Sequence, residues 1–427
     1  MASCSLIEMT ATPQEPELHP IPVLFFDHIA LMSGGERSLL DMMRGLDRSR
    51  YRAELALPEE GPLAVAAREA GLKVHLLPFP ESLRRVPRWG GLLGGLRIGH
   101  LIATLRASRS LAKLICRRRI RIVHTNSMKA HVIACMARLW SRFRLVWHVR
   151  DIIQSAGLRS VIGLLALQFP DRILCISQAV ARSIPFIDSW RAGERIVIIH
   201  NGIEAQPRNS RDQIRAEWGV PKATRLIGMV GQIARWKGQH VFVEAARLVL
   251  EQRPDCVFVI VGRVMFEENE SEFFEKIERE LRDGGLEGRI QLKGFHQDPI
   301  AVMAALDILV HASIEAEPFG RVLIEAMSQA CPVIASRLGG PSEILVDGVS
   351  GILVDPNNAD LLASRIMNLL DEPRWAQSLG IAGRDRFQAR FTLHRLIDEV
   401  ETVYSDLLRP PDGAGSGKRA TQEAVIR

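Results

Sequence analysis

Two glutamates in the second half of the chain have the type and spacing to act on one ligand. They stand eight residues apart in EPFGRVLIEA, where Pro318 and Gly320 follow Glu317 and an apolar run surrounds Glu325. Proline is favoured in the first turn of a helix, and the apolar residues that follow keep a helical spacing. This pattern predicts Glu317 at a helix entrance and Glu325 about two turns further in. At ~1.5 Å of rise per residue their Cα atoms would lie roughly 12 Å apart, which suits an elongated ligand with hydroxyl groups at both ends.

The start of the same predicted helix is a candidate phosphate site. Its first backbone amides have no acceptor within the helix and lie at the positive end of the helix dipole. These amides belong to Gly320, Arg321, Val322 and Leu323. The Glu325 carboxylate lies in an apolar stretch and needs a polar partner there, unless it occupies an exposed helix position.

Two glycine turns each follow a predicted strand and precede a predicted helix. The first, SGGERSLL, contains Gly34 and Gly35, which allow a tight turn and a close approach of a ligand to the backbone. The second, VGQIARWKGQHVFVEA, adds Arg235 and Lys237, two cations that could hold a diphosphate beside a helix N-terminus. Taken singly, the glycine pair is more often ordinary turn chemistry, and the two cations are equally typical of a solvated loop.

Polar side chains also follow other predicted strands. His148 in WHVRD stands where a ring nitrogen could donate a hydrogen bond to a ligand in a cleft. Ser177 in CISQAV is first a candidate helix N-cap and only secondarily a contact residue. Glu343 lies in the glycine-rich segment GGPSE, near the start of another predicted helix.

The elements that must position these residues alternate between strand and helix. Strand-like apolar runs occupy 23–30, 53–58, 73–79, 120–127, 144–151, 172–177 and 195–203, and a second series occupies 225–233, 256–262, 289–295, 308–313, 332–336 and 351–355. Helix-length segments separate most of them, which is typical of parallel sheets covered by helices on both faces. The sequence therefore predicts an α/β fold of two tandem Rossmann-like, doubly wound parallel-sheet domains that face a central cleft.

The polar stretch at 204–223 carries no strand signal and is interpreted as the region that links the two domains. The predicted organisation is a flexible N-terminus (1–20), a first Rossmann-like domain (21–205), a second one (206–390), a C-terminal helix that returns to the first domain (391–409) and a disordered tail (410–427).

Composition argues against disulfide-rich, zinc-binding, secreted and membrane-spanning proteins. The 427 residues are 47% apolar and 24% charged, a soluble globular balance, and the six cysteines form no CxxC pair that would indicate a zinc site or a disulfide framework. The acidic, Pro-containing N-terminus lacks the pattern of a secretory signal, and residues 89–105 are too polar for a membrane span. A protein of the reducing cytoplasm, without a zinc site or disulfides, is expected.

Positive charge is concentrated in the first half of the chain. Between Glu81 and Asp151 there are 16 Lys and Arg and no Asp or Glu. The stretch LRRVPRWGGLLGGLRIGHLIATLR mixes arginines with Leu, Ile and Trp89, as a segment at a membrane surface does. We expect an anionic membrane surface as a partner, with an ordinary solvated surface as the alternative. Nucleic acid is not expected, because the basic run lacks interleaved Phe and Tyr.

Taken in order along the chain, the motifs resemble those of the GT-B glycosyltransferases of family 4, which are retaining nucleotide-sugar enzymes. The matching pieces are SGGE, WHVRD, CIS, IHNGI, the KG of RWKG, EAEPFGRVLIEAM, PVIAS and GGPSE, over about residues 22–355. The resemblance implies that a sugar moves from a nucleotide sugar to a hydroxyl of a glycan or lipid-linked acceptor, in polysaccharide or glycolipid synthesis. It implies retained anomeric configuration and no metal or other cofactor.

The resemblance also assigns roles to residues. Glu317 would face the hydroxyls of the donor sugar, and Glu325 would bind the ribose hydroxyls of the nucleotide. Lys237 would hold the diphosphate, Gly35 would close over the phosphates from the opposite domain, and His148 would lie beside the donor sugar. Glu317, His148 and Lys237 are therefore the expected catalytic residues.

One position departs from the family pattern. The family usually has Arg directly after the glycine of the first strand of the second domain, and here this residue is Gln232. An amide cannot replace the charge, so either Arg235 takes its place or phosphate binding is weaker than in relatives. Two other functions stay open, a nucleotide-sugar epimerase of GT-B fold and a noncatalytic protein that binds nucleotide sugars.

Overall fold

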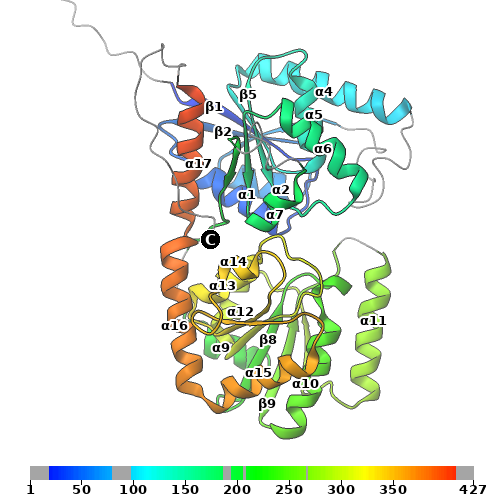
Figure 1. Cartoon of the computed structure of the whole chain (residues 1–427), viewed down its shortest axis with the longest axis vertical. Helices are drawn as coiled ribbons and strands as arrows, with labels where there is room; N and C mark the ends of the chain where they lie inside the picture. The colour runs from blue at the N-terminus through cyan, green and yellow to red at the C-terminus, as the bar shows by residue number, and fades with distance from the viewer. Residues whose placement is uncertain (1–18, 79–97, 186–193, 205–207, 266–267, 410–427) are drawn as a thin grey trace, which may run out of the picture.

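The computed structural model describes residues 19–78, 98–185, 194–204, 208–265 and 268–409 of the chain. Figure 1 shows an elongated molecule in which two domains are stacked along the long axis, and two long C-terminal helices run along one edge of both. The predicted flexible N-terminus and disordered tail lie almost wholly outside the described residues. So does the segment 79–97, which holds the first part of the basic stretch.

The first domain is built on a seven-stranded sheet of order β3-β2-β1-β4-β5-β6-β7, in which every neighbouring pair is parallel. Its strands are β1 (Ile21–Phe26), β2 (Tyr51–Leu57), β3 (Lys73–Leu76), β4 (Ile122–Thr125), β5 (Arg144–Val149), β6 (Arg172–Cys175) and β7 (Ile196–Ile198). Its helices are α1 (Gly34–Gly45), α2 (Pro62–Glu69), α4 (Ile98–Arg118), α5 (Met128–Ala137), α6 (Ala156–Gln168) and α7 (Gln178–Ser183).

The central strand β1 explains why this sheet is covered on both faces. Val23 and Phe25 pack into one apolar cluster with α1, whereas Leu24 and Phe26 pack into another with α4 and α5. All four side chains are fully buried. A strand that buries alternate residues in two different cores reads as a continuous apolar run, as IPVLFF does.

The second domain repeats the plan with a six-stranded parallel sheet of order β10-β9-β8-β11-β12-β13. Its strands are β8 (Arg225–Val230), β9 (Cys256–Val261), β10 (Ile290–Gly294), β11 (Ile308–His311), β12 (Val333–Ser336) and β13 (Ile352–Val354). Its helices are α9 (Arg211–Glu217), η1 (Arg235–Lys237), α10 (Gln239–Gln252), α11 (Glu268–Asp283), α12 (Pro299–Ala305), α13 (Arg321–Ser328), α14 (Pro341–Ile344) and α15 (Ala359–Asp371).

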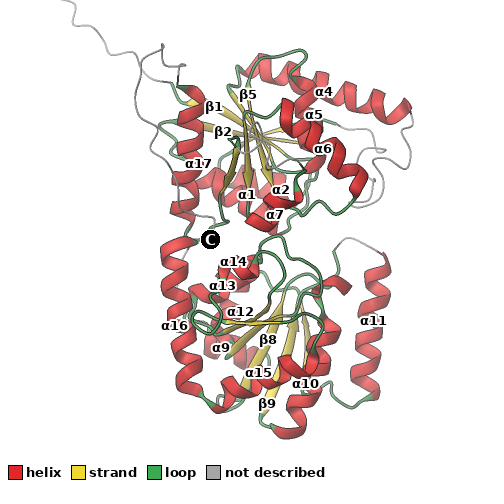
Figure 2. Cartoon of the chain, in the orientation of Figure 1, coloured by secondary structure: helices red, strands yellow, loops and turns green. Residues whose placement is uncertain are grey.

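The two parallel sheets, shown in yellow between red helices in Figure 2, confirm the predicted fold class. Each of the thirteen apolar runs identified in the sequence contains or overlaps one strand of these sheets. The polar stretch at 204–223 does contain a short helix, α9, which the sequence did not predict. This helix packs on α12, and its buried Arg215 lies 2.6 Å from the Asp307 carboxylate.

Helices α16 (Pro373–Arg390) and α17 (Leu393–Leu408) connect the domains a second time. Helix α16 packs on α13 of the second domain, and α17 packs on α1 of the first. Between them the chain pairs with the segment that leaves the first domain: the Ile203 amide donates to Phe391 O at 3.0 Å, and the Leu393 amide donates to Ile203 O at 2.9 Å. Both crossings between the domains therefore lie side by side.

Candidate active site

The candidate site lies where loops at the carboxyl ends of strands from both sheets meet. The Ser177 hydroxyl, at the end of β6, donates to the Pro318 carbonyl of the second domain at 2.6 Å. It also accepts from the Val180 amide at 3.1 Å, which confirms Ser177 as the N-cap of α7. In open α/β sheets this edge is the one that binds ligands.

Glu317 is the centre of a buried polar cluster in the second domain. Its Oε2 atom lies 2.5 Å from Nζ of Lys237, 3.2 Å from Nε2 of His311 and 3.4 Å from Oγ of Ser313. Burial raises the pKa of Glu317, but the Lys237 ammonium and the His311 ring outweigh it and hold this pKa at about 2. Two predicted catalytic residues, Glu317 and Lys237, are thus a direct ion pair.

A glycine brings Lys237 to this position. Gly238, which follows η1, has a left-handed backbone (φ 78°). A Cβ atom there would collide with the backbone of Ala312, at the end of β11. Only glycine lets the loop approach β11 so closely, and this approach places the Lys237 ammonium beside Glu317.

Glu317 does not stand at a helix entrance, so this prediction was wrong. Helix α13 begins at Arg321, after Gly320 in a left-handed conformation (φ 100°), and Glu325 lies in its first turns. Glu317 instead forms a parallel bridge with Gly339, whose missing side chain leaves room for the Glu317 backbone. Pro318 therefore belongs to a loop and not to the first turn of the helix. The apolar spacing after Pro318 is helical, so no sign of this loop appears in the sequence.

The polar partner of Glu325 is Arg321, which lies on the same helix. The Arg321 Nε atom donates to the Glu325 carboxylate at 2.9 Å, and Arg321 Nη2 donates to Asp41 on α1 at 2.9 Å. The second bond crosses from one domain to the other. Arg321 Nη1 is a buried donor without a hydrogen-bond partner in the described part of the chain. Burial raises the pKa of Glu325, and the Arg321 charge only partly offsets this effect.

His148, at the end of β5, is fully buried in a chain of ring contacts. Its Nδ1 atom lies 3.0 Å from Nε2 of His124 and 3.3 Å from Nη2 of Arg150. The other nitrogen of His124, Nδ1, lies 2.7 Å from the Tyr404 hydroxyl on α17. The pKa values of both histidines are lowered well below their usual range, mainly by burial and then by the Arg150 charge, so both rings are neutral.

These contacts fix the tautomers of the two rings. An arginine donates and never accepts, so His148 Nδ1 must be an acceptor. His124 Nε2 must then carry a proton and donate to it, and His124 Nδ1 must accept from the Tyr404 hydroxyl. The remaining proton of His148 therefore sits on Nε2, and this buried atom has no partner among the residues that the structure describes.

The first domain contributes the start of α1 to the site. Gly34 and Gly35 are its first two residues, and neither has a positive φ, so the predicted tight turn is not needed there. A Cβ at Gly35 would lie 3.6 Å from the Arg150 side chain, which packs underneath. Arg150 is held by Asn126, by Asn201 at 2.8 Å and by Ser38 at 3.1 Å. Burial lowers its pKa to about 10.

Arg235 and Gln232 are not brought to the Glu317 cluster by any described contact. The Arg235 side chain is exposed, and its Cζ atom lies 5.3 Å from the ring centroid of Phe273 on α11. The Arg235 amide donates to Glu270 at 2.6 Å. The Gln232 carbonyl accepts from the Gln239 side chain at 2.9 Å. The predicted substitution of Arg235 for the missing family arginine would require its guanidinium to leave Phe273.

Sequence reasoning missed four residues that hold the site together: His311, Arg150, Asp41 and Tyr404. A signal existed for two of them, because His311 and Arg150 lie near the carboxyl ends of predicted strands as His148 does. Asp41 and Tyr404 lie on helix faces, where only the fold reveals their partners.

The described residues contain neither a metal cluster nor a membrane-spanning helix. No group of three or more His, Cys, Asp and Glu side chains in them is arranged to hold a metal ion. No described helix is long and apolar enough to cross a membrane.

Two family models match the chain, one after the other. The model described as Glycosyltransferase Family 4 matches residues 32–206, and the model described as Glycosyl transferases group 1 matches residues 210–386. The first match lies in the first domain, and the second covers most of the second domain.

Curated relatives carry the names of glycosyltransferases. The UDP-Gal:alpha-D-GlcNAc-diphosphoundecaprenol alpha-1,3-galactosyltransferase of Escherichia coli is 23% identical over 394 residues, which are 88% of this chain and 95% of that protein. The D-inositol 3-phosphate glycosyltransferase of Corynebacterium diphtheriae is 29% identical over 203 residues. This second match covers 47% of this chain and 46% of that protein.

Solved structures share the fold. The crystal structure of Anabaena HepE in complex with UDP-glucose is 24% identical, with a TM-score of 0.77, and the match covers 90% of this chain and 100% of that one. A glycosyltransferase from Rickettsia africae is 21% identical, with the same TM-score of 0.77, over 92% of this chain and 100% of that one. With one family model on each domain and this fold throughout, the chain belongs to the group 1 glycosyltransferases of GT-B fold.

Proposed function

We propose that this protein is a retaining, metal-independent hexosyltransferase that moves a sugar from a nucleotide-sugar donor to a hydroxyl of a glycan or lipid-linked acceptor. Cell-surface polysaccharide or glycolipid synthesis is the process that such a product serves. The observation that carries the proposal is the buried Lys237–Glu317 ion pair, which lies next to the α13 N-terminus at the junction of the domains. A cation, a carboxylate and free helix amides together match a ligand with phosphates and hydroxyls.

In the proposed reaction, the bond between the anomeric carbon and the diphosphate oxygen breaks, and its electron pair stays on the diphosphate. The acceptor hydroxyl oxygen bonds to the anomeric carbon on the same face, and its proton goes to the leaving phosphate oxygen. Lys237 and the amides of Gly320, Arg321 and Val322 stabilise the charge on the diphosphate. The Leu323 amide, predicted for the same role, already donates to Gly320 O at 2.9 Å. Gly35 closes over the phosphates from the first domain.

The other predicted residues bind the two ends of the donor. Glu317 accepts hydrogen bonds from hydroxyls of the donor sugar, and the His148 Nε2–H group donates to that sugar. Glu325 binds the ribose hydroxyls, for which it exchanges its contact with Arg321. The division of roles follows from the resemblance, and the orphan proton of His148 agrees with it.

We further propose that the protein works in the cytoplasm, attached peripherally to the inner face of the plasma membrane. The excess of 16 basic over no acidic residues between Glu81 and Asp151 supports this placement. The E. coli relative is named for a UDP-Gal donor and a diphosphoundecaprenol-linked acceptor, and the HepE structure holds UDP-glucose. UDP sugars and lipid-linked acceptors are therefore the first candidates to test.

The decisive experiment is a thermal-shift screen against UDP, GDP, ADP, CMP and their common sugars. A true ligand at ~100 times its dissociation constant should add about 2.7 kcal/mol to the free energy of unfolding. With the ligand found, Glu325→Ala should weaken nucleotide binding, whereas Glu317→Ala should reduce turnover more than it reduces binding.

Binding and activity measurements on the pure protein distinguish the alternatives. Equal loss of nucleotide affinity in both glutamate variants would contradict the division of roles. Release of an epimerised product without any acceptor would indicate the epimerase. A protein that binds the donor but never hydrolyses it, even slowly, would be a noncatalytic binder.

A further inference from the structure

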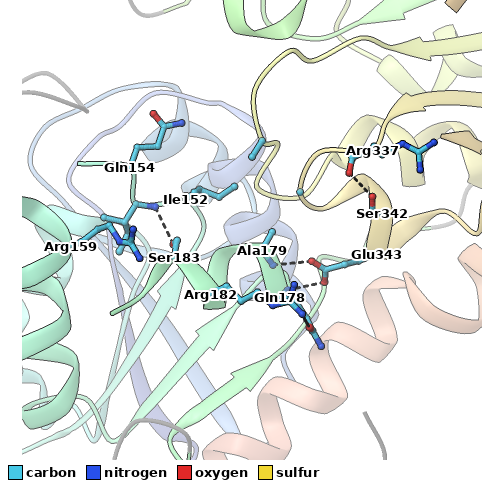
Figure 3. Close-up of a pocket in the computed structure, with 13 residues that line it drawn as sticks. Ile152, Gln154, Arg159, Gln178, Ala179, Arg182, Ser183, Arg337, Ser342 and Glu343 are labelled. Carbon is cyan, nitrogen blue, oxygen red and sulfur yellow. Dashed lines mark hydrogen bonds between the residues drawn. The ribbon is translucent and has the colours of Figure 1, made fainter. Parts of the chain in front are cut away.

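A cavity of about 790 Å³ lies between the two domains, and none of the roles proposed so far uses it (Figure 3). One wall comes from the loop after β5, Ile152–Gln154, and from residues of α6 and α7. The other wall comes from Ala316, the loop that follows β12 and helix α14. Ala316 directly precedes Glu317, so this wall of the cavity continues into the segment that carries Glu317.

Two of the four charged residues that line this cavity already have strong partners. The Glu343 carboxylate accepts from the Gln178 and Ala179 amides at 2.8 and 3.0 Å, and it lies 3.1 Å from His200 Nε2. The Arg337 guanidinium pairs with Asp355 at 2.8 Å. Figure 3 shows the Arg337 side chain directed away from Gln178 and from the opposite wall.

The other two, Arg159 on α6 and Arg182 on α7, keep their charge available. Both side chains are exposed, and within the described ranges no carboxylate pairs with either of them. Among the described residues, Arg182 donates only to the neutral Gln178 side chain, at 3.1 Å. Both arginines line the same cavity, and a guanidinium without a carboxylate partner is a good donor to the oxygens of a phosphate group.

We propose that Arg159 and Arg182 bind a phosphate or diphosphate group of the acceptor. The inference rests on the proposed function, because it takes this cavity between the domains, next to the segment that carries Glu317, as the place of the incoming acceptor. The donor diphosphate has its own partners in Lys237 and the α13 amides, so this second anion site serves a different molecule. The acceptor is thus a phosphorylated sugar, either soluble or carried on a lipid diphosphate.

The test is calorimetric titration of the UDP-saturated protein with inorganic pyrophosphate, since UDP then fills the donor phosphate site. We expect pyrophosphate to bind, and Arg159→Gln combined with Arg182→Gln to weaken it at least ~10-fold, as for lost charge-assisted hydrogen bonds. The UDP affinity should change less than twofold. Arg337→Gln is the matched control, because it removes a lining arginine whose guanidinium faces Asp355, and it should leave pyrophosphate binding unchanged.

A parallel titration with farnesyl diphosphate separates the two sources of the phosphate group. Binding at least tenfold tighter than that of pyrophosphate supports a lipid-linked acceptor, and equal binding supports a soluble sugar phosphate. The anion site is overturned if pyrophosphate binds the wild type and the double variant equally well. It is also overturned if the UDP-loaded wild type does not bind pyrophosphate. The protein could bind pyrophosphate through both arginines and yet bind no nucleotide. This result would support the anion site but contradict the proposed function.

Discussion

The Tyr404 hydroxyl donates a hydrogen bond to Nδ1 of His124 at 2.7 Å, although 280 residues separate the two in the chain. Tyr404 lies on α17, the last helix, and is fully buried against the first domain. Arg150 makes Nδ1 of His148 an acceptor, and the Tyr404 hydroxyl from the C-terminal helix holds His124 in the tautomer that donates to this atom. Tyr404 is therefore a positioning residue for a proposed catalytic side chain.

Tyr404→Phe keeps the ring and removes only the hydroxyl that sets the His124 tautomer. His124 can then hold its proton on Nδ1, which leaves two lone pairs facing each other between His124 and His148. A lost hydrogen bond of ~1 to 1.5 kcal/mol predicts that kcat falls about tenfold while the Kd of the nucleotide is unchanged. Nitrogen NMR of the histidine rings should show a mixed tautomer population for His124, whereas His148 keeps its proton on Nε2 because Arg150 still donates to Nδ1.

Tyr51→Phe is the matched control, because Tyr51 is the only other tyrosine of the chain and packs at the same helix. Its hydroxyl lies 3.1 Å from Ser405 Oγ and makes no contact with either histidine ring. This variant should lose stability without changing kcat or the tautomers. If the Tyr404→Phe enzyme keeps the wild-type kcat, or if kcat falls equally in the Tyr51→Phe enzyme, Tyr404 serves only in packing.

The Lys237–Glu317 pair predicts a pH dependence of stability. The pKa of Glu317 is about 2 in the folded protein and 4.5 is its usual value, so the unfolded chain binds this proton first as the pH falls. The stabilisation is complete above about pH 4.5 and is lost between there and pH 2. Urea unfolding should show a steeper loss of free energy across this window for wild type than for Glu317→Gln.

Removal of the lysine tests the same pair at neutral pH. Lys237→Met leaves a buried carboxylate without its ammonium partner and should cost about 3 kcal/mol of unfolding free energy. Adding Glu317→Gln to that variant should recover most of the loss, because no unpaired charge then remains. Additive effects of the two substitutions would show that the pair is not coupled in solution.

The strands could be predicted from the sequence because each is a short apolar run between turn residues, and β1 and β9 are apolar on both faces. The strand-end residues Glu317, Lys237 and His148 could be found for the same reason, since the carboxyl ends of parallel strands share one edge. The local pattern also identified Ser177 correctly as a helix cap.

The contacts between these residues could not be predicted. The helical apolar spacing after Pro318 gave no sign that Gly320 is left-handed. Because of this glycine, α13 begins about one turn later than predicted. The partners of Arg321 and His124 come from α1 and α17, and only the packing of distant helices brings Asp41 and Tyr404 to them. The pairing of Lys237 with Glu317 depends on how closely Gly238 approaches β11, a distance that no sequence pattern encodes.

Gln232 and Arg235 yield a prediction for donor binding. If Arg235 leaves Phe273 to replace the charge that Gln232 lacks, Arg235→Ala should weaken donor binding by ~1.5 to 3 kcal/mol, the cost of a hydrogen bond to a charged group. Gln232→Arg should restore part of this loss in the double variant. Calorimetry with the nucleotide sugar measures both. Unchanged donor affinity in Arg235→Ala would leave Arg235 as a surface cation stacked on Phe273.

The first domain carries an exposed surface suited to an anionic membrane. On α4, Leu101 and Ile102 are 51% and 43% exposed, and Arg106 and Arg109 follow on the exposed face of the same helix. The Arg109 guanidinium lies 5.2 Å from the ring centroid of Trp140, which is 38% exposed. Apolar side chains beside arginines allow shallow insertion together with attraction to anionic lipid. Arg84, Arg85 and Arg88, which belong to the same basic stretch, lie outside the described residues.

Flotation with liposomes tests this attachment. The protein should float with anionic vesicles, less so as salt rises, and not with neutral vesicles. Each arginine near an anionic leaflet contributes about 1 kcal/mol, so Arg106→Glu with Arg109→Glu should weaken binding by at least roughly thirtyfold. Arg374→Glu with Arg384→Glu, the same charge change on exposed positions of α16, should leave flotation intact. Equal flotation with neutral and anionic vesicles, or an equal loss of flotation in both double variants, would contradict membrane binding by the α4 surface. A soluble acceptor would then be favoured.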